Sequence, residues 1–157
     1  MKILIALFFL SFSHASIANL TGNFKSEFKR KSMDCVIESQ LQQLNDHSLK
    51  FKVWDEYCED DKGNSYESSL ADEMIYEKMK DGNIKVKQGA DSVIVKTFLA
   101  DFSKTKVHYH FEVNTEDGLL DIEESYELKN KYLDFFSVYK LDGEVIIDKS
   151  GTLERIK

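Results

Sequence analysis

Apolar and polar residues alternate with a period of two along most of this chain. The clearest runs span 20–28, 49–58, 106–113 and 120–128. Their apolar or aromatic members are Leu20, Phe24 and Phe28, then Leu49, Phe51, Val53 and Tyr57, then Val107, Tyr109, Phe111 and Val113, and finally Leu120, Ile122, Tyr126 and Leu128. The intervening residues are mainly polar or charged, which is typical of β-strands that place one face on a core.

Residues that favour turns separate these runs. They are Asn45-Asp46-His47, Asp60-Asp61-Lys62-Gly63-Asn64, Asp81-Gly82-Asn83, Glu116-Asp117-Gly118, Asp142-Gly143 and Ser150-Gly151. Gly, Asn and Asp tolerate positive φ and close β-hairpins. A series of hairpins with one apolar face must close on itself or fold over to bury that face. We therefore predict an all-β fold, a single antiparallel meander of about eight to ten strands that closes into a barrel, with a sandwich as the alternative.

Residues 68–80 fit two patterns. Leu70 and Met74 are spaced as on one face of a helix, and Gly82 would suit the end of a short helix. In the alternative, Met74 and Tyr76 alternate with glutamates and enter a hairpin at Gly82. The hairpin is the favoured interpretation, and a short helix is the other.

The amino-terminal segment has the features of a secretory signal peptide. A single lysine precedes the apolar run Ile3–Leu10, and small residues fit cleavage after Ala15 or Ala18. A membrane-spanning helix needs about 20 apolar residues, which this run does not reach, and no later run reaches it. We predict a signal peptide at 1–18, a single β-barrel domain at 19–157, export to the periplasm or extracellular space, and no membrane span.

Two cysteines are predicted to form a disulfide, because exported proteins meet an oxidising compartment. Cys35 and Cys58 lie symmetrically about the turn Asp46-His47, so the bond would join the two arms of one hairpin. Simple pairing about this turn, however, places Cys58 on the opposite face from Phe51. A one-residue β-bulge would correct the faces, and we expect an irregularity within 42–48.

The charge restricts the classes of partner. The chain has 21 Lys and Arg against 28 Asp and Glu, a net charge of −7. Nucleic-acid binding relies on cations that neutralise phosphates, so no nucleic-acid partner is predicted. An acidic surface attracts cationic proteins, although it also serves solubility alone.

One cluster of potential metal ligands lies on a single strand face. His108, His110 and Glu112 share one parity and offer two imidazoles and a carboxylate. The other interpretation is a solvent-facing strand surface, and we favour it. We predict no metal and no cofactor. No nucleophile elbow or phosphate-binding loop is present, so no enzyme activity is predicted.

Three carboxylates share parity with apolar residues of their runs. Asp55, Asp72 and Glu124 would approach one interior if these parities face inward. Buried carboxylates are costly unless they are paired or hydrogen-bonded. They would then orient a ligand or perform acid–base chemistry, whereas local bulges or positions at the barrel opening would leave them solvated.

Aromatic residues make up 12% of the chain and many fall on the inner parity. They fit either a packed core or a cavity for one small ligand. The ligand-binding residues predicted on this basis are Phe24, Phe51, Asp55, Tyr57, Asp72, Tyr109, Phe111, Glu124 and Tyr126.

The segment Leu20-Thr21-Gly22-Asn23-Phe24 is similar to the Gly-x-Trp start of the first strand in lipocalins and other calycins, with Phe24 in place of Trp. In those proteins an arginine of the last strand packs on the Trp, and Arg155 occupies a comparable position. The resemblance implies a small β-barrel binding protein for a small apolar or amphipathic ligand. The alternative is an acidic protein-interaction module, such as an inhibitor of or shield against a cationic secreted partner.

Overall fold

The computed structural model describes residues 19–156, which form eleven β-strands and no helix. The predicted signal peptide and its two cleavage sites lie outside the described residues. The strands are β1 (Gly22–Arg30), β2 (Met33–Asn45), β3 (Ser48–Asp60), β4 (Ser65–Ser69), β5 (Met74–Lys78), β6 (Ile84–Gln88), β7 (Asp91–Phe102), β8 (Lys106–Thr115), β9 (Gly118–Lys129), β10 (Tyr132–Leu141) and β11 (Glu144–Ile156).

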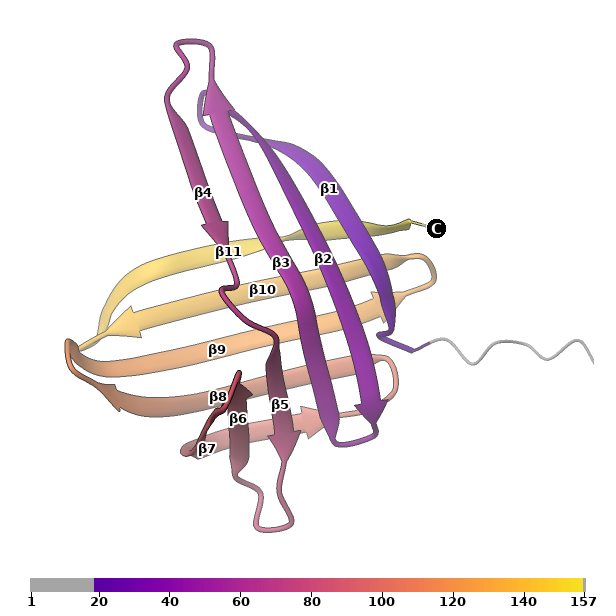
Figure 1. Cartoon of the computed structure of the whole chain (residues 1–157), viewed down its shortest axis with the longest axis vertical. Helices are drawn as coiled ribbons and strands as arrows, with labels where there is room; N and C mark the ends of the chain where they lie inside the picture. Colours follow the sequence, from indigo (N-terminus) through magenta and orange to yellow (C-terminus); the bar gives the residue numbers. More distant parts are fainter. Residues whose placement is uncertain (1–18, 157) are drawn as a thin grey trace, which may run out of the picture.

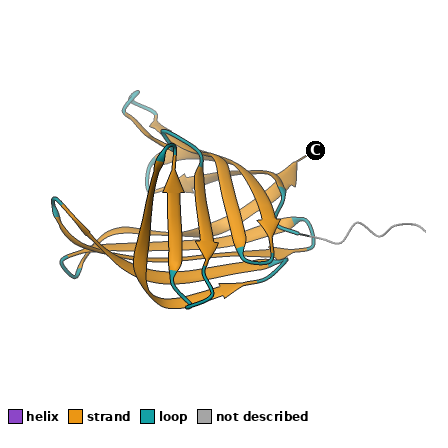
Figure 2. Ribbon diagram, turned by 60° about the horizontal axis from the view of Figure 1, so that its bottom comes forward, coloured by secondary structure: helices purple, strands orange, loops and turns teal. Residues whose placement is uncertain are grey.

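The strands form one antiparallel sheet that closes on itself. Its order is β2-β1-β11-β10-β9-β8-β7-β6-β5-β3-β4, and pairing of β2 with β3 completes the ring. Strand β4 lies outside the ring as an extra strand on β3. In Figure 1, β1 to β4 cross β8 to β11, and Figure 2 shows the strands wrapping around a common interior. The prediction of an all-β antiparallel barrel is confirmed.

The 68–80 segment adopts the predicted hairpin and not the helix. Strand β5 pairs with β6 through the turn at Asp81-Gly82. Gly82 has φ of +89°, a conformation that glycine adopts without strain. Among the described residues there is no helix with the length and apolar character of a membrane span.

The ring is weakly closed between its first and last strands. Only Asn23–Lys25 of β1 pair with Glu154–Ile156 of β11. Strand β3 is also divided, because Ser48–Phe51 pair with β5 and Asp55–Glu59 pair with β4. Side chains must therefore hold the sheet together where backbone pairing between β1 and β11 stops.

A β-bulge in β3 reverses which residues face the interior. Gln40 pairs with Val53 and Leu41 pairs with Phe51, so Lys52 is the extra residue. A second register shift lies between Gln43 and Asn45, within the expected range, but it does not account for the faces of the cysteines. The expected irregularity within 42–48 is therefore present, but the bulge that brings both cysteines to the same face lies at Lys52, outside that range. This bulge lets Phe51 and the later residues of β3 contribute to one core despite their opposite parity.

The predicted disulfide is confirmed. Cys35 and Cys58 are directly opposite one another in the β2–β3 register, are buried, and form a bond. Only Asp46-His47 lie between the two strands, which agrees with the predicted turn.

The first and last strands meet through Phe24 and Arg155. Phe24 is fully buried, and the Arg155 guanidinium lies 5.3 Å from its ring centroid. The guanidinium also donates to the carbonyl oxygens of Asn19 and Thr21. Gly22 is adjacent, and a Cβ there would lie 3.0 Å from Arg155 Nε. This contact ties the start of β1 to the end of β11.

Candidate functional site

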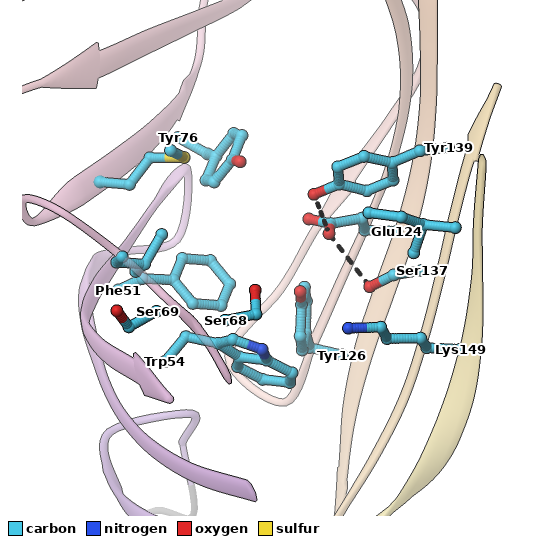
Figure 3. Close-up of a pocket in the computed structure, with 13 residues that line it drawn as sticks. Phe51, Trp54, Ser68, Ser69, Tyr76, Glu124, Tyr126, Ser137, Tyr139 and Lys149 are labelled. Carbon is cyan, nitrogen blue, oxygen red and sulfur yellow. Dashed lines mark hydrogen bonds between the residues drawn. The ribbon is translucent and has the colours of Figure 1, made fainter. Parts of the chain in front are cut away.

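A cavity of about 170 Å³, partly open to solvent, lies between β3–β5 on one side and β9–β11 on the other. Figure 3 shows the two sides facing each other across it. Its aromatic lining comes from Phe51, Trp54, Tyr76, Tyr126 and Tyr139. Its principal polar lining comes from Ser68, Ser69, Glu124, Ser137 and Lys149.

The aromatic lining is mutually packed. The Phe51 ring lies edge-on to Tyr126 at 5.0 Å and to Tyr76 at 5.7 Å between centroids. Trp54 lies edge-on to Tyr126 at 5.9 Å and to Phe135 at 5.3 Å. Such contacts stabilise ring positions beyond simple burial, so the cavity walls are largely preformed.

The rest of the interior next to the cavity is filled. Tyr76 stacks on Tyr109 with centroids 4.6 Å apart, and Tyr109 stacks on Phe111 at 5.7 Å. Phe102 covers the other side of Tyr109 at 6.3 Å. The interior beside the cavity is therefore a packed aromatic core.

Glu124 forms the polar centre of the cavity and is only 5% exposed. Its Oε1 accepts hydrogen bonds from the Ser137 hydroxyl at 3.0 Å and the Tyr139 hydroxyl at 2.7 Å (Figure 3). Its Oε2 accepts a hydrogen bond from the Tyr109 hydroxyl. Strands β8 and β10 thus direct these donors onto one buried carboxylate of β9.

Burial raises the pKa of the Glu124 carboxyl above its ordinary value of 4.5, and the hydroxyl donors partly oppose that rise. Burial, followed by the nearby Glu124 carboxylate, also raises the pKa values of Tyr76, Tyr109, Tyr126 and Tyr139. The tyrosines therefore stay neutral hydrogen-bond donors over the physiological range, and Glu124 is the titrating group of the cavity.

The raised pKa predicts a pH-dependent stability difference between the wild type and Glu124→Gln. The folded state holds a proton that the unfolded state releases above about pH 4.5. The wild type should lose stability relative to the variant as pH rises from 4.5 through the raised pKa of Glu124. Urea unfolding of both proteins across pH 4 to 8 measures the difference. If the free energies of unfolding of the two proteins change in parallel with pH, the raised pKa of Glu124 is contradicted. Glu123→Gln, on the outer face, serves as the control.

A buried ion pair lies at one side of the cavity. Glu56 is 1% exposed, and its Oε2 contacts Lys149 Nζ of β11. Arg30 Nη1 of β1 lies 3.5 Å from Glu56 Oε1. The carboxylate of β3 thus joins β1 and β11 in the region where these two strands have no backbone pairing.

The six predicted ligand-binding residues that are buried fall into three groups. Phe51, Glu124 and Tyr126 line the cavity. Tyr109 lies behind it and bonds to Glu124. The two other buried members, which belong to the core away from the cavity lining, are Phe24 and Phe111.

Three predicted positions do not face the interior. Asp55 and Tyr57 are exposed, because the bulge at Lys52 turns them to the outer face of β3. Asp72 is exposed as well, because it lies in the connection between β4 and β5, where strand parity does not apply. Their predicted inward orientation is therefore wrong, and of the three carboxylates only Glu124 reaches the interior.

Sequence reasoning missed several residues of the cavity. Trp54 falls on the polar parity of the 49–58 run, and it was missed because the bulge at Lys52 turns it inward. Ser137 and Tyr139 lie on the inward parity of 132–141, a run whose alternation would have identified them. The remaining missed residues are Ser68, Ser69, Leu70, Met74, Tyr76, Ile147 and Lys149.

His108 and His110 of β8 lie on the outer face of the sheet. His108 Nε2 is 3.0 Å from Glu123 Oε1, and His110 Nε2 is 2.7 Å from Asp121 Oδ1. Each histidine is thus paired with a separate carboxylate of β9. Within residues 19–156, no three His, Cys, Asp or Glu side chains are grouped so that they could hold a metal ion.

Comparison with known proteins identifies no relative of this chain. No protein-family model, curated protein or solved structure matches the chain.

Proposed function

We propose that this protein binds a small, mainly apolar ligand in the cavity between β3–β5 and β9–β11. The observation that carries the proposal is the combination of a preformed aromatic lining with one buried polar centre, Glu124. Ligand sites are typically apolar concavities that contain a few well-placed polar groups. Export of the protein is part of the proposal, and the Cys35–Cys58 bond fits an oxidising compartment.

The cavity volume limits the size of the ligand. At about 170 Å³ it is smaller than the roughly 300–1,000 Å³ typical of sites for drug-sized molecules. An engineered cavity of about 150 Å³ in another protein holds benzene. A ligand with one aromatic ring and a short polar substituent matches this volume. The alternative function, an acidic module for a cationic protein, rests on the net charge of −7 and stays a prediction.

Trp54 provides a direct measurement of binding, because it is the only tryptophan in the chain and it lines the cavity. Titration with 2-phenylethanol should change its emission saturably and raise the melting temperature. A molecule of this size is expected to bind with a free energy of about −4 to −7 kcal/mol, a Kd between roughly 1 mM and 10 µM.

A pair of variants on β4 tests the location of the ligand site. Ser68→Phe places a ring in the cavity and should weaken binding at least tenfold. Glu67→Phe adds the same ring on the opposite face, where Glu67 pairs with Tyr57, and should leave binding unchanged. If no single-ring probe binds the wild type at millimolar concentration, or if both variants behave alike, the proposed site is wrong.

A further inference from the structure

We propose that the ligand of this cavity is a small organic cation, an aromatic primary amine whose ammonium group contacts Glu124. The inference rests on the proposed function and specifies its ligand class. It follows from the charges around the cavity, from its aromatic walls and from its size.

The cavity contains a buried carboxyl group, Glu124, without a positive partner. Among the described residues, Glu124 makes no ion pair, and its hydrogen-bond donors are neutral hydroxyls. Lys149 also lines the cavity, but its ammonium group is paired with the buried Glu56. Because a buried carboxylate is costly without a cation, an ammonium group on the ligand would supply the missing charge.

The aromatic lining suits the same ligand class. Ammonium groups are attracted to the faces of Trp, Tyr and Phe within about 6 Å of the ring centroid. Trp54, Tyr126 and Tyr139 line the cavity together with Glu124, and the rest of the ligand can pack on Phe51 and Tyr76 (Figure 3). The same residues therefore accommodate an aromatic ring and its cationic substituent.

Other ligand classes fit less well. An anion would meet Glu124 and would have to take Lys149 from Glu56, leaving that carboxylate buried without its closest partner. A long acyl chain would extend out of a cavity of about 170 Å³ and leave part of its apolar surface in water. The net charge of −7 also favours the approach of cations.

A panel of three probes of nearly equal size tests the inference in the wild-type protein. The probes are 2-phenylethylamine, 2-phenylethanol and phenylacetate, measured by Trp54 fluorescence and by calorimetry at pH 7.5. The amine should bind at least tenfold more tightly than the alcohol, and phenylacetate at least tenfold more weakly. If the alcohol binds as tightly as the amine, the inference is overturned while the proposed function stands. If none of the probes binds, the proposed function itself fails.

Two adjacent carboxylates of β9 provide matched variants. Glu124→Gln should bring the amine to within about threefold of the alcohol and leave alcohol binding largely intact. Glu123→Gln, on the outer face beside His108, should retain the full preference for the amine. A preference that persists in folded Glu124→Gln would overturn the inference.

A pH titration of the wild type keeps the inference testable if Glu124→Gln does not fold. The amine requires ionised Glu124, so its affinity should fall on acidification through the pKa of that group, whereas alcohol affinity should not. The other titratable groups facing Glu124 are Tyr76 of β5, Tyr109 of β8, Tyr126 of β9, Tyr139 of β10 and Lys149 of β11. Burial raises the pKa values of these tyrosines further, so they do not titrate in the acidic range. Amine and alcohol affinities that change in parallel with pH would overturn the inference.

Discussion

Replacing Lys149 with Met is expected to lower the free energy of unfolding by about 3 kcal/mol. The substitution retains much of the apolar volume but leaves the Glu56 carboxylate, 1% exposed, without its closest cation. Arg30 does not replace it, because its guanidinium lies 3.5 Å away and its side chain is 46% exposed. Urea unfolding monitored by Trp54 fluorescence measures the loss.

The position of the pair explains why a large effect is expected. Glu56 lies on β3 and Lys149 on β11, and their contact spans the region where β1 and β11 have no backbone pairing. Removal of Lys149 should therefore increase amide hydrogen exchange in 144–150 more than in β8 and β9. Such a local effect would distinguish loss of this link from general destabilisation.

Two further variants control the interpretation. Lys131→Met removes an exposed ion pair with Glu154 and should cost less than about 1 kcal/mol. Glu56→Gln combined with Lys149→Met removes the buried charge as well, so this double variant should be more stable than Lys149→Met alone. If the double variant is less stable than the single one, an unpaired charge is not the cause of the loss.

The barrel could be predicted because burial of one sheet face imposes a period of two on the sequence. The apolar residues of the run 106–113 form the inward face of β8, where Val107, Tyr109 and Phe111 are buried. Glu124 shares the parity of the buried residues of β9, so the same alternation correctly predicts that this carboxylate is buried. The parity of a residue predicts its face reliably where the strand keeps one register along its whole length.

The incorrect face assignments on β3 result from a single inserted residue. Lys52 is inserted opposite the Gln40–Leu41 step, and every later residue of β3 exchanges faces. Trp54 therefore enters the cavity and Asp55 leaves the interior. A bulge depends on how two strands align with each other, so the alternation within one strand does not reveal it. The cysteines did indicate that a bulge must exist, because both had to reach the same face.

Sequence alone also could not separate cavity walls from packed core. Phe111 and Phe51 carry the same signal, an aromatic residue on an inward parity, yet only Phe51 lines the cavity. The difference arises from stacking of Tyr76 on Tyr109, a contact between β5 and β8, which are not neighbours in the sheet. Lys149 was missed for a related reason, because its partner Glu56 is 93 residues away in the chain.

Reduction of the Cys35–Cys58 bond is expected to lower the free energy of unfolding by about 3 kcal/mol. The bond closes a loop with a sequence separation of 23 and restricts the unfolded chain accordingly. It lies toward the open end of the β2–β3 hairpin, far from the turn at Asp46-His47, where hairpin pairing would otherwise fray.

Unfolding of the oxidised and reduced wild-type protein measures this effect without any change of side chain. The variant Cys35→Ala/Cys58→Ala should resemble the reduced protein and should not respond to reductant. Its stability should be slightly lower, because both positions are buried and each substitution removes a sulfur atom from the core. Thiol titration of the denatured, unreduced protein should find no free thiol. Two free thiols, or equal stability of the oxidised and reduced forms, would show that the bond does not constrain the chain in solution.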